Sequence, residues 1–147
     1  MELYYHLYLR RGVLFLPTTG RVEKGHYRNA EPVAVVPISN TEGAREALRA
    51  TVARGNPPTP HYQPGNYPPS PILKYAGVKS WSIFARDAKT WSIHEENEIY
   101  QIVGYRKHAK GYWVEDSDQK IDFPPGTTVD AVIERMIAIL EEAASLG

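Results

Sequence analysis

The chain has 147 residues, of which 42% are hydrophobic and 23% are charged, which is typical of one globular domain with its own core. It contains no cysteine, which excludes disulfides, thiolate nucleophiles and cysteine-based zinc sites. No apolar run approaches the roughly 20 residues that span a bilayer, and the N-terminus lacks the pattern of a secretory signal. We therefore expect a cytoplasmic protein with no membrane partner.

Positive and negative residues balance overall but are unevenly distributed. Lysine plus arginine and aspartate plus glutamate both number 17, so no overall basic field favours nucleic acid as a partner. Residues 1–79 contain ten basic and five acidic residues, a net charge of +5, whereas residues 80–147 contain seven and twelve, a net charge of −5. These opposite charges either attract one another within the fold or serve a charged partner.

Residues 3–54 are predicted to form four short strands followed by a helix. Residues 3–9 and 13–16 are rich in aromatic and aliphatic side chains, and an Arg-Arg-Gly turn separates them. The helix is predicted over about residues 40–54. Ser39, with a glutamate three residues later, resembles a capping box, and a glycine and a proline follow the last helical residue.

Residues 55–71 contain seven of the twelve prolines and are predicted to connect two structural units. The alternative is a docking segment that uses Tyr62 and Tyr67. After this connector, residues 80–89 place Trp81 and other apolar side chains on one helical face, which predicts a short helix.

Residues 91–144 are predicted to form four antiparallel strands and a second helix. Polar breaks at 95–98 and 106–111 and an acidic turn at 115–118 separate apolar runs of strand character. A Pro-Pro-Gly sequence then ends the last strand, and Thr127 is a plausible helix cap. Six apolar residues form one stripe of the helix: Val129, Val132, Ile133, Met136, Ile137 and Leu140.

The two predicted units resemble each other. A shift of 86 residues pairs Tyr5 with Trp91 and Val13 with Ile99, and a gap of two residues then aligns the helices. A chance similarity of two strand-rich segments is the alternative. The predicted fold is an α+β single domain over residues 1–147, in which two pseudo-repeated ββββα units form an antiparallel sheet with the helices packed on it.

No pattern in the sequence indicates catalysis, a metal or a cofactor. The histidines are His6, His26, His61, His94 and His108, and no pair of them has the spacing of a metal site on a helix or a strand. There is no glycine-rich phosphate loop, and no serine lies in a nucleophile elbow. We therefore expect a protein that is not an enzyme.

Acidic residues gather in the predicted turns of the second unit, close in sequence to aromatic ones. Carboxylates can steer a basic protein, and aromatic side chains can anchor it. The alternative is a solvated rim that protects the edge of the sheet. The candidate partner-binding residues are Glu95, Glu96, Glu98, Tyr112, Trp113, Glu115, Asp116, Asp118 and Asp122.

A short cysteine-free chain with aromatic-rich antiparallel strands, an acidic half and no catalytic residues resembles the immunity proteins of bacterial toxin systems, including contact-dependent growth inhibition. The resemblance is one of general character over the whole chain. It implies an inhibitor that binds a cognate toxin, commonly a cationic nuclease, and blocks its active site. The alternatives are a non-catalytic ligand-binding or scaffolding module and a small enzyme with an unrecognised site.

Overall fold

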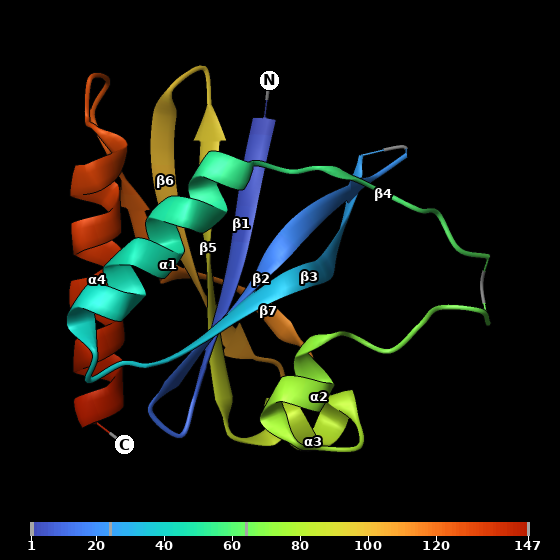
Figure 1. Ribbon diagram of the computed structural model, residues 1–147. Coiled ribbons are helices and arrows are strands. Elements are labelled where there is room, and N and C mark those ends of the chain that lie inside the picture. Colours follow the sequence, from blue (N-terminus) through green and yellow to red (C-terminus); the bar gives the residue numbers. More distant parts are fainter. Residues whose placement is uncertain (1, 24, 64, 147) are drawn as a thin grey trace.

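The computed structural model describes residues 2–23, 25–63 and 65–146. Six long strands form one antiparallel sheet in the order β3-β2-β1-β5-β6-β7, and a two-residue strand, β4, pairs in parallel with the end of β2 (Figure 1). The strands are β1 (Glu2–Arg10), β2 (Val13–Val22), β3 (His26–Pro37), β4 (Pro58–Thr59), β5 (Ala88–Glu96), β6 (Ile99–Lys107) and β7 (Trp113–Asp122). The predicted α+β class with an antiparallel sheet is confirmed.

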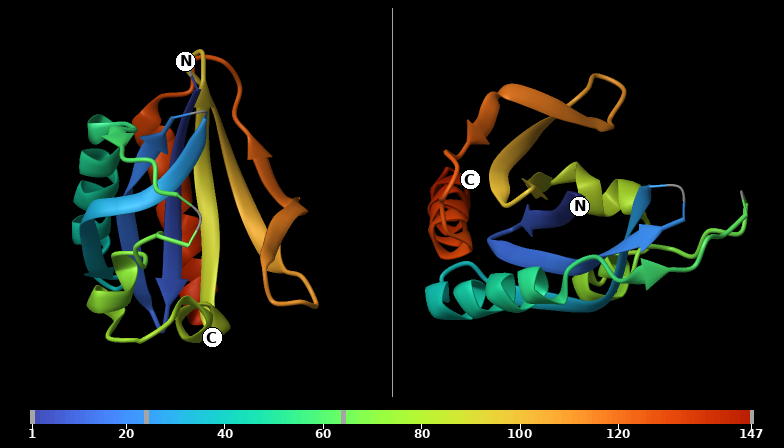
Figure 2. Two further views of the ribbon diagram at one scale, coloured as in Figure 1. Left: turned by 90° about the vertical axis from the view of Figure 1, so that its right-hand side faces the viewer. Right: turned by 90° about the horizontal axis from the view of Figure 1, so that it is seen from above.

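Two long helices, α1 (Thr41–Arg54) and α4 (Val129–Ser145), pack against each other and cover one face of the curved sheet (Figures 1 and 2). Alternate strand residues point into this core, as the period of a strand requires. Leu48 of α1 and Met136 of α4 are fully buried. The predicted stripe of α4 is confirmed, because all six of its residues lie in or against the core.

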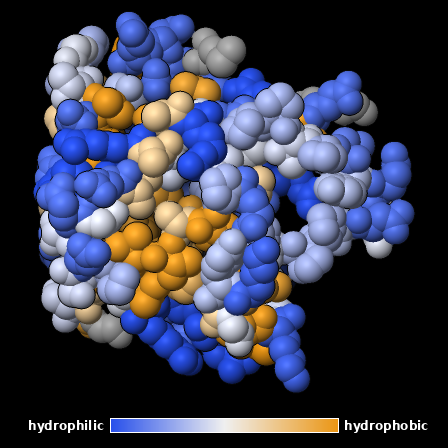
Figure 3. Space-filling model, in the orientation of Figure 1, coloured by the Kyte–Doolittle hydropathy of each residue, from blue (hydrophilic) through white to orange (hydrophobic). Residues whose placement is uncertain are grey.

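Two short helices, α2 (Ile72–Ala76) and α3 (Trp81–Arg86), cover only one end of the opposite face. Their apolar side chains form a second cluster with Tyr8 and Phe15 of the sheet. Helix α3 is shorter than the predicted range of 80–89 because its last residues already belong to β5. Helix α2 was not predicted. Figure 3 shows the side that carries α1, where an apolar area lies over β3 among hydrophilic surroundings.

Each unit contains three strands, so the prediction of four was wrong. Residues 115–118, expected to form a turn, lie within β7, and all but Glu115 belong to a bulge. Val103 pairs with Lys120 and Tyr105 with Glu115, so four residues of β7 lie opposite Gly104. A bulge of this kind absorbs extra residues without ending the ladder. The β2–β3 ladder has a register shift at Pro17, which corresponds to Val103 after a shift of 86.

The strands of the two units fall at matching sequence positions. A shift of 86 residues places β1 on β5, and a shift of 88 places the start of α1 on that of α4. The antiparallel β1–β5 ladder pairs His6 with Ser92, which are themselves 86 residues apart. The strand order is therefore pseudo-symmetric about this pair. An ancestral duplication of the unit stays a prediction.

The caps of both long helices lie one residue after the predicted caps, Ser39 and Thr127. Asn40 caps α1 by accepting a hydrogen bond from the Gly43 N–H, and Thr128 caps α4 by accepting one from Ala131. In each case a side-chain oxygen bonds the amide three residues ahead, which is the usual capping geometry.

Candidate functional site

Four of the predicted acidic residues lie together at one end of the sheet. Glu95, Glu96 and Glu98 surround the β5–β6 turn, in which Asn97 and Glu98 have positive φ angles. Asp122 ends β7 beside them, and its carboxylate accepts a hydrogen bond of 2.6 Å from Gln101.

Of the other three acidic residues, Asp116 and Asp118 lie in the bulge of the outer strand β7, and Glu115 directly precedes it. Hydrogen bonds from the Gln119 amide and the Asp118 backbone N–H lower the pKa of Asp116. Glu115 lies 3.5 Å from the Lys120 ammonium. The two groups of carboxylates that the sequence placed in separate turns therefore belong to one acidic edge, which we define as Glu95, Glu96, Glu98, Glu115, Asp116, Asp118 and Asp122.

The two predicted aromatic residues lie apart from the acidic turn. Tyr112 precedes β7 and Trp113 begins it. Trp113 pairs with Lys107 and Asp122 with Gln101, which are six residues apart on β6, so the ends of β7 are about 20 Å apart. Tyr112 is 52% exposed and stacks on His108. Trp113 is half-buried against Trp81, with the Lys107 ammonium over its ring. The structure therefore does not bring the aromatic candidates together with Glu95, Glu96 and Glu98.

Several first-half cations pair with second-half acids that do not belong to the acidic edge. Asp87 bonds both Arg10 and Arg11 at 2.7 Å. Across the two long helices, Arg45 bonds Glu134 and Arg49 bonds Asp130. Part of the charge asymmetry therefore acts within the fold. Most of the acidic edge is different, because five of its carboxylates form no ion pair with the residues described: Glu95, Glu96, Glu98, Asp118 and Asp122.

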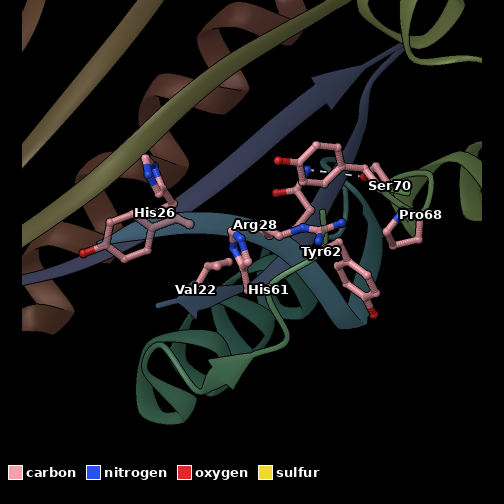
Figure 4. Close-up of a pocket in the computed structure, with 10 residues that line it drawn as sticks. Val22, His26, Arg28, His61, Tyr62, Pro68 and Ser70 are labelled. Atoms are coloured by element: carbon pink, nitrogen blue, oxygen red, sulfur yellow. Dashed lines mark hydrogen bonds between the residues drawn. The ribbon is translucent and has the colours of Figure 1, made fainter. Parts of the chain in front are cut away.

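Sequence reasoning missed a pocket of about 430 Å³ under the proline-rich connector (Figure 4). The Arg28 guanidinium carbon lies 4.6 Å from the centre of the Tyr62 ring and 5.5 Å from that of Tyr67. Its Nη1 atom is buried and has no hydrogen-bond partner among the described residues. Asn29 lies behind it and donates to Tyr8 and Ser70. The connector is thus more than a spacer, because its tyrosines cover an arginine of β3.

The open part of the sheet face carries polar and aromatic residues from both units. His6 lies opposite Ser92, and burial lowers the pKa of its imidazole. Ser92 is fully buried and shares a hydrogen bond of 3.1 Å with the Tyr105 hydroxyl. The Ser92 hydroxyl is therefore engaged and inaccessible to a substrate.

The β1–β5 ladder also brings three potential metal ligands together. Donor atoms of Glu2, His94 and Glu96 lie within 4.8 Å of one another, and Nε2 of His94 is buried without a hydrogen-bond partner among the described residues. Spacing along the sequence could not reveal the complete set, because Glu2 belongs to β1 and lies far in sequence from His94 and Glu96 of β5. The predicted absence of a metal stays a prediction, and elemental analysis of the purified protein tests it.

No family model matches the sequence, and no curated protein matches it. The fold is similar to the solved structure of a protein of unknown function from Neisseria meningitidis, with a TM-score of 0.65 over 97% of this chain and 95% of that one. The two sequences are 10% identical, so the likeness concerns the fold alone. Among the described residues, none of the helices combines the length and apolar character required to cross a membrane.

Proposed function

We propose that the protein is a cytoplasmic inhibitor of the immunity type, which binds a cognate basic toxin through the acidic edge and blocks its active site. The observation that supports this proposal is the concentration of five carboxylates without ion-pair partners among the described residues. These unpaired carboxylates do not contribute to the stability of the fold, because like charges repel one another and disfavour the compact state.

The acidic edge suits a protein partner for a second reason. Strand β7 is the last strand of the sheet, so its outer side is open to a neighbouring molecule. A nuclease presents a basic surface to its nucleic acid substrate, and carboxylates arranged along a strand offer a competing surface of the opposite sign. The same charges accelerate encounter over distances of about 8–10 Å at physiological salt.

The test measures binding kinetics against the product of the adjoining gene at several ionic strengths. Replacing Glu95, Glu96 and Glu98 together by glutamine should lower the association rate and flatten its salt dependence, with a smaller effect on dissociation. A matched control replaces Glu42, Glu46 and Glu141, which lie on the two long helices. An association rate that changes neither with salt nor with the triple replacement would show that the interface lies outside the acidic edge.

A second candidate function is a ligand-binding module, supported by the pocket around Arg28. Its unpartnered guanidinium nitrogen and its tyrosine walls suit a small anion. Titration with inorganic phosphate and with acetate, followed by the NMR signals of Arg28 and Tyr62, tests this function. The Arg28→Gln variant is the control. If the NMR signals of the parent protein do not respond to either anion, this ligand-binding function is wrong.

A further inference from the structure

The sheet opens between neighbouring strands at two places, one in each unit. Strands β1 and β2 pair only next to their turn, through Tyr8–Arg10 and Val13–Phe15. Strands β5 and β6 pair from their turn as far as Trp91 and Gly104, and beyond this point they separate. Figure 2 shows the β6–β7 hairpin diverging from β5 toward the end opposite the acidic turn.

The first opening is filled by an extended segment of this chain. The Asn56 side-chain amide donates to the backbone carbonyls of Tyr4 and Thr19, at 2.6 and 2.9 Å, and its oxygen accepts the Tyr4 N–H at 3.0 Å. The next residue, Pro57, accepts the Arg21 N–H, and β4 follows it alongside β2. One side chain and a short strand thus satisfy backbone groups that the parted strands leave unpaired.

The second opening lies at the corresponding place of the second unit but is shorter than the first. Leu7 and Leu16 no longer pair, whereas their counterparts Ile93 and Ile102 do. A shift of 86 residues takes Tyr4 to Thr90 and Thr19 to Tyr105, which are the first residues beyond the β5–β6 ladder. Each of them is paired only with the strand on its other side. No residue of the described chain bridges them as Asn56 bridges their counterparts. A cavity of about 590 Å³ lies there, and Trp91, Tyr105 and Leu146 contribute to its walls.

The charges around this second opening are positive. Arg86, Lys89, Arg106 and Lys107 line the cavity, and none of them forms an ion pair with a described residue. Asp87, which also lines it, is bound by Arg10 and Arg11. The Lys107 ammonium donates to the Ala85 carbonyl, and Glu115 pairs with Tyr105 at the edge of the opening. The opening therefore combines two parted strands, aromatic walls and a mainly positive rim.

We propose that the opening between β5 and β6 is a docking site for an extended acidic segment of a partner protein. The segment would lie between the strands as residues 56–59 do in the first unit, with an asparagine or glutamine amide bridging the backbones of Thr90 and Tyr105. Its carboxylates would face the lysines and arginines of the rim. Addition of a strand to a free edge supplies backbone hydrogen bonds, and the side chains then provide selectivity.

A peptide backbone suits this opening better than a nucleic acid does. The parted strands present N–H and C=O groups, which a peptide satisfies reciprocally, whereas phosphates accept hydrogen bonds only. The occupant of the first opening is itself a peptide. The site lies at the end of β6 opposite the acidic turn, so this proposal does not depend on Glu95, Glu96 and Glu98.

The experiment uses the complete protein and a synthetic peptide with the sequence of residues 55–59, flanked on each side by two aspartates. Backbone amide shifts recorded by NMR should change and saturate at Ala88–Trp91 and Gly104–Lys107, with a dissociation constant of about 1 mM or lower. Two control peptides carry lysine flanks or leucine in place of the asparagine, and each should bind at least about tenfold more weakly.

Matched variants locate the site. Replacing Lys89 and Arg106 by glutamate should weaken the binding of the acidic peptide at least about tenfold. Lys79→Glu, an exposed change between α2 and α3, should leave this binding unchanged. Absence of saturable shifts, equal binding of the lysine-flanked peptide, or shifts confined to Tyr4 and Thr19 would each overturn the proposal. Tighter binding of a short single-stranded oligodeoxynucleotide than of the peptide would also overturn it.

Discussion

Asn56 connects three segments of backbone that are far apart in sequence, although it lies in a stretch that looks like a linker. Its amide makes three hydrogen bonds to Tyr4 and Thr19 where β1 and β2 separate. Sequence reasoning could not identify this role, because an asparagine between a glycine and two prolines has the composition of a turn. The same limit applies to Arg28, whose tyrosine neighbours lie in the connector.

Replacing Asn56 by alanine should lower the free energy of unfolding by about 1–3 kcal/mol, because the Tyr4 and Thr19 backbone groups lose their partner. Urea denaturation measures the effect. Asn66 is the control, since it is exposed in the same connector and its alanine variant should be as stable as the parent. Equal stability of the two variants would show that water replaces the Asn56 amide.

Two buried tyrosines should make the protein sensitive to alkali. Burial raises the pKa of both Tyr5 and Tyr8 to about 12. An unfolded tyrosine ionises near pH 10, so stability is complete below about pH 10 and falls as pH rises toward 12. The loss should approach about 1.4 kcal/mol per pH unit for each tyrosine within this window.

The measurement compares urea denaturation of the parent and Tyr8→Phe between pH 8 and 12. The variant should be less stable at pH 8, because the Asn29 amide loses its acceptor, but its stability should fall less steeply with pH. Parallel pH profiles for the two proteins would assign the alkaline loss to other groups.

At the scale of elements, the bulge of β7 depends on a glycine in the neighbouring strand. A Cβ atom on Gly104 would lie 2.6 Å from Cβ of Gln119, which is closer than side-chain carbons approach. The bulge therefore needs a residue without a side chain at the position it faces. This requirement explains why residues 115–118 can remain in a strand despite a composition typical of a turn.

Gly104→Ala should lower the free energy of unfolding by about 1–3 kcal/mol, because the added methyl group displaces the bulge. Gln119→Gly removes the atoms it would strike, so the double variant should recover part of the loss. A double-mutant cycle by chemical denaturation gives this coupling energy. Simple additivity of the two changes would mean that the bulge adapts by another route.

Periodicity along the sequence predicts most elements but not how they pair. The stripe of α4 and the strands β1, β2, β5 and β6 follow local patterns, and the shift of 86 residues between the units was visible in the sequence. The prediction of a fourth strand in each unit was wrong, because a bulge and a turn contain the same residue types. The separation of Trp113 from the acidic turn depends on the length and direction of β7. A local pattern does not specify either.

At the scale of the whole molecule, the pseudo-symmetric sheet places regions of opposite charge at the two ends of β6. Glu95, Glu96, Glu98 and Asp122 lie at the β5–β6 turn, whereas four cations line the opening at the other end, with Glu115 beside them. The net charge of zero conceals this arrangement, and so does the negative charge of the second half. Each end suits a different kind of partner surface.

The pseudo-symmetry predicts how one unit behaves alone. A polypeptide of residues 88–146 exposes the edge of β5 that normally pairs with β1, and Ser92 lies at the centre of that ladder. Two copies should pair through β5 about this residue, with two α4 helices in the places of α1 and α4. Analytical ultracentrifugation should therefore detect a dimer. A folded monomer at all concentrations would contradict this expectation.

The β1–β5 ladder at the centre of the sheet also constrains the order of folding. It joins residues that are 78 to 94 positions apart, from Arg10 with Ala88 to Glu2 with Glu96, whereas the strands on either side of it belong to local hairpins. Contacts between distant residues form slowly, because the intervening chain must first be ordered. During synthesis, the edge of β1 that faces β5 therefore stays unpaired until β5 has left the ribosome.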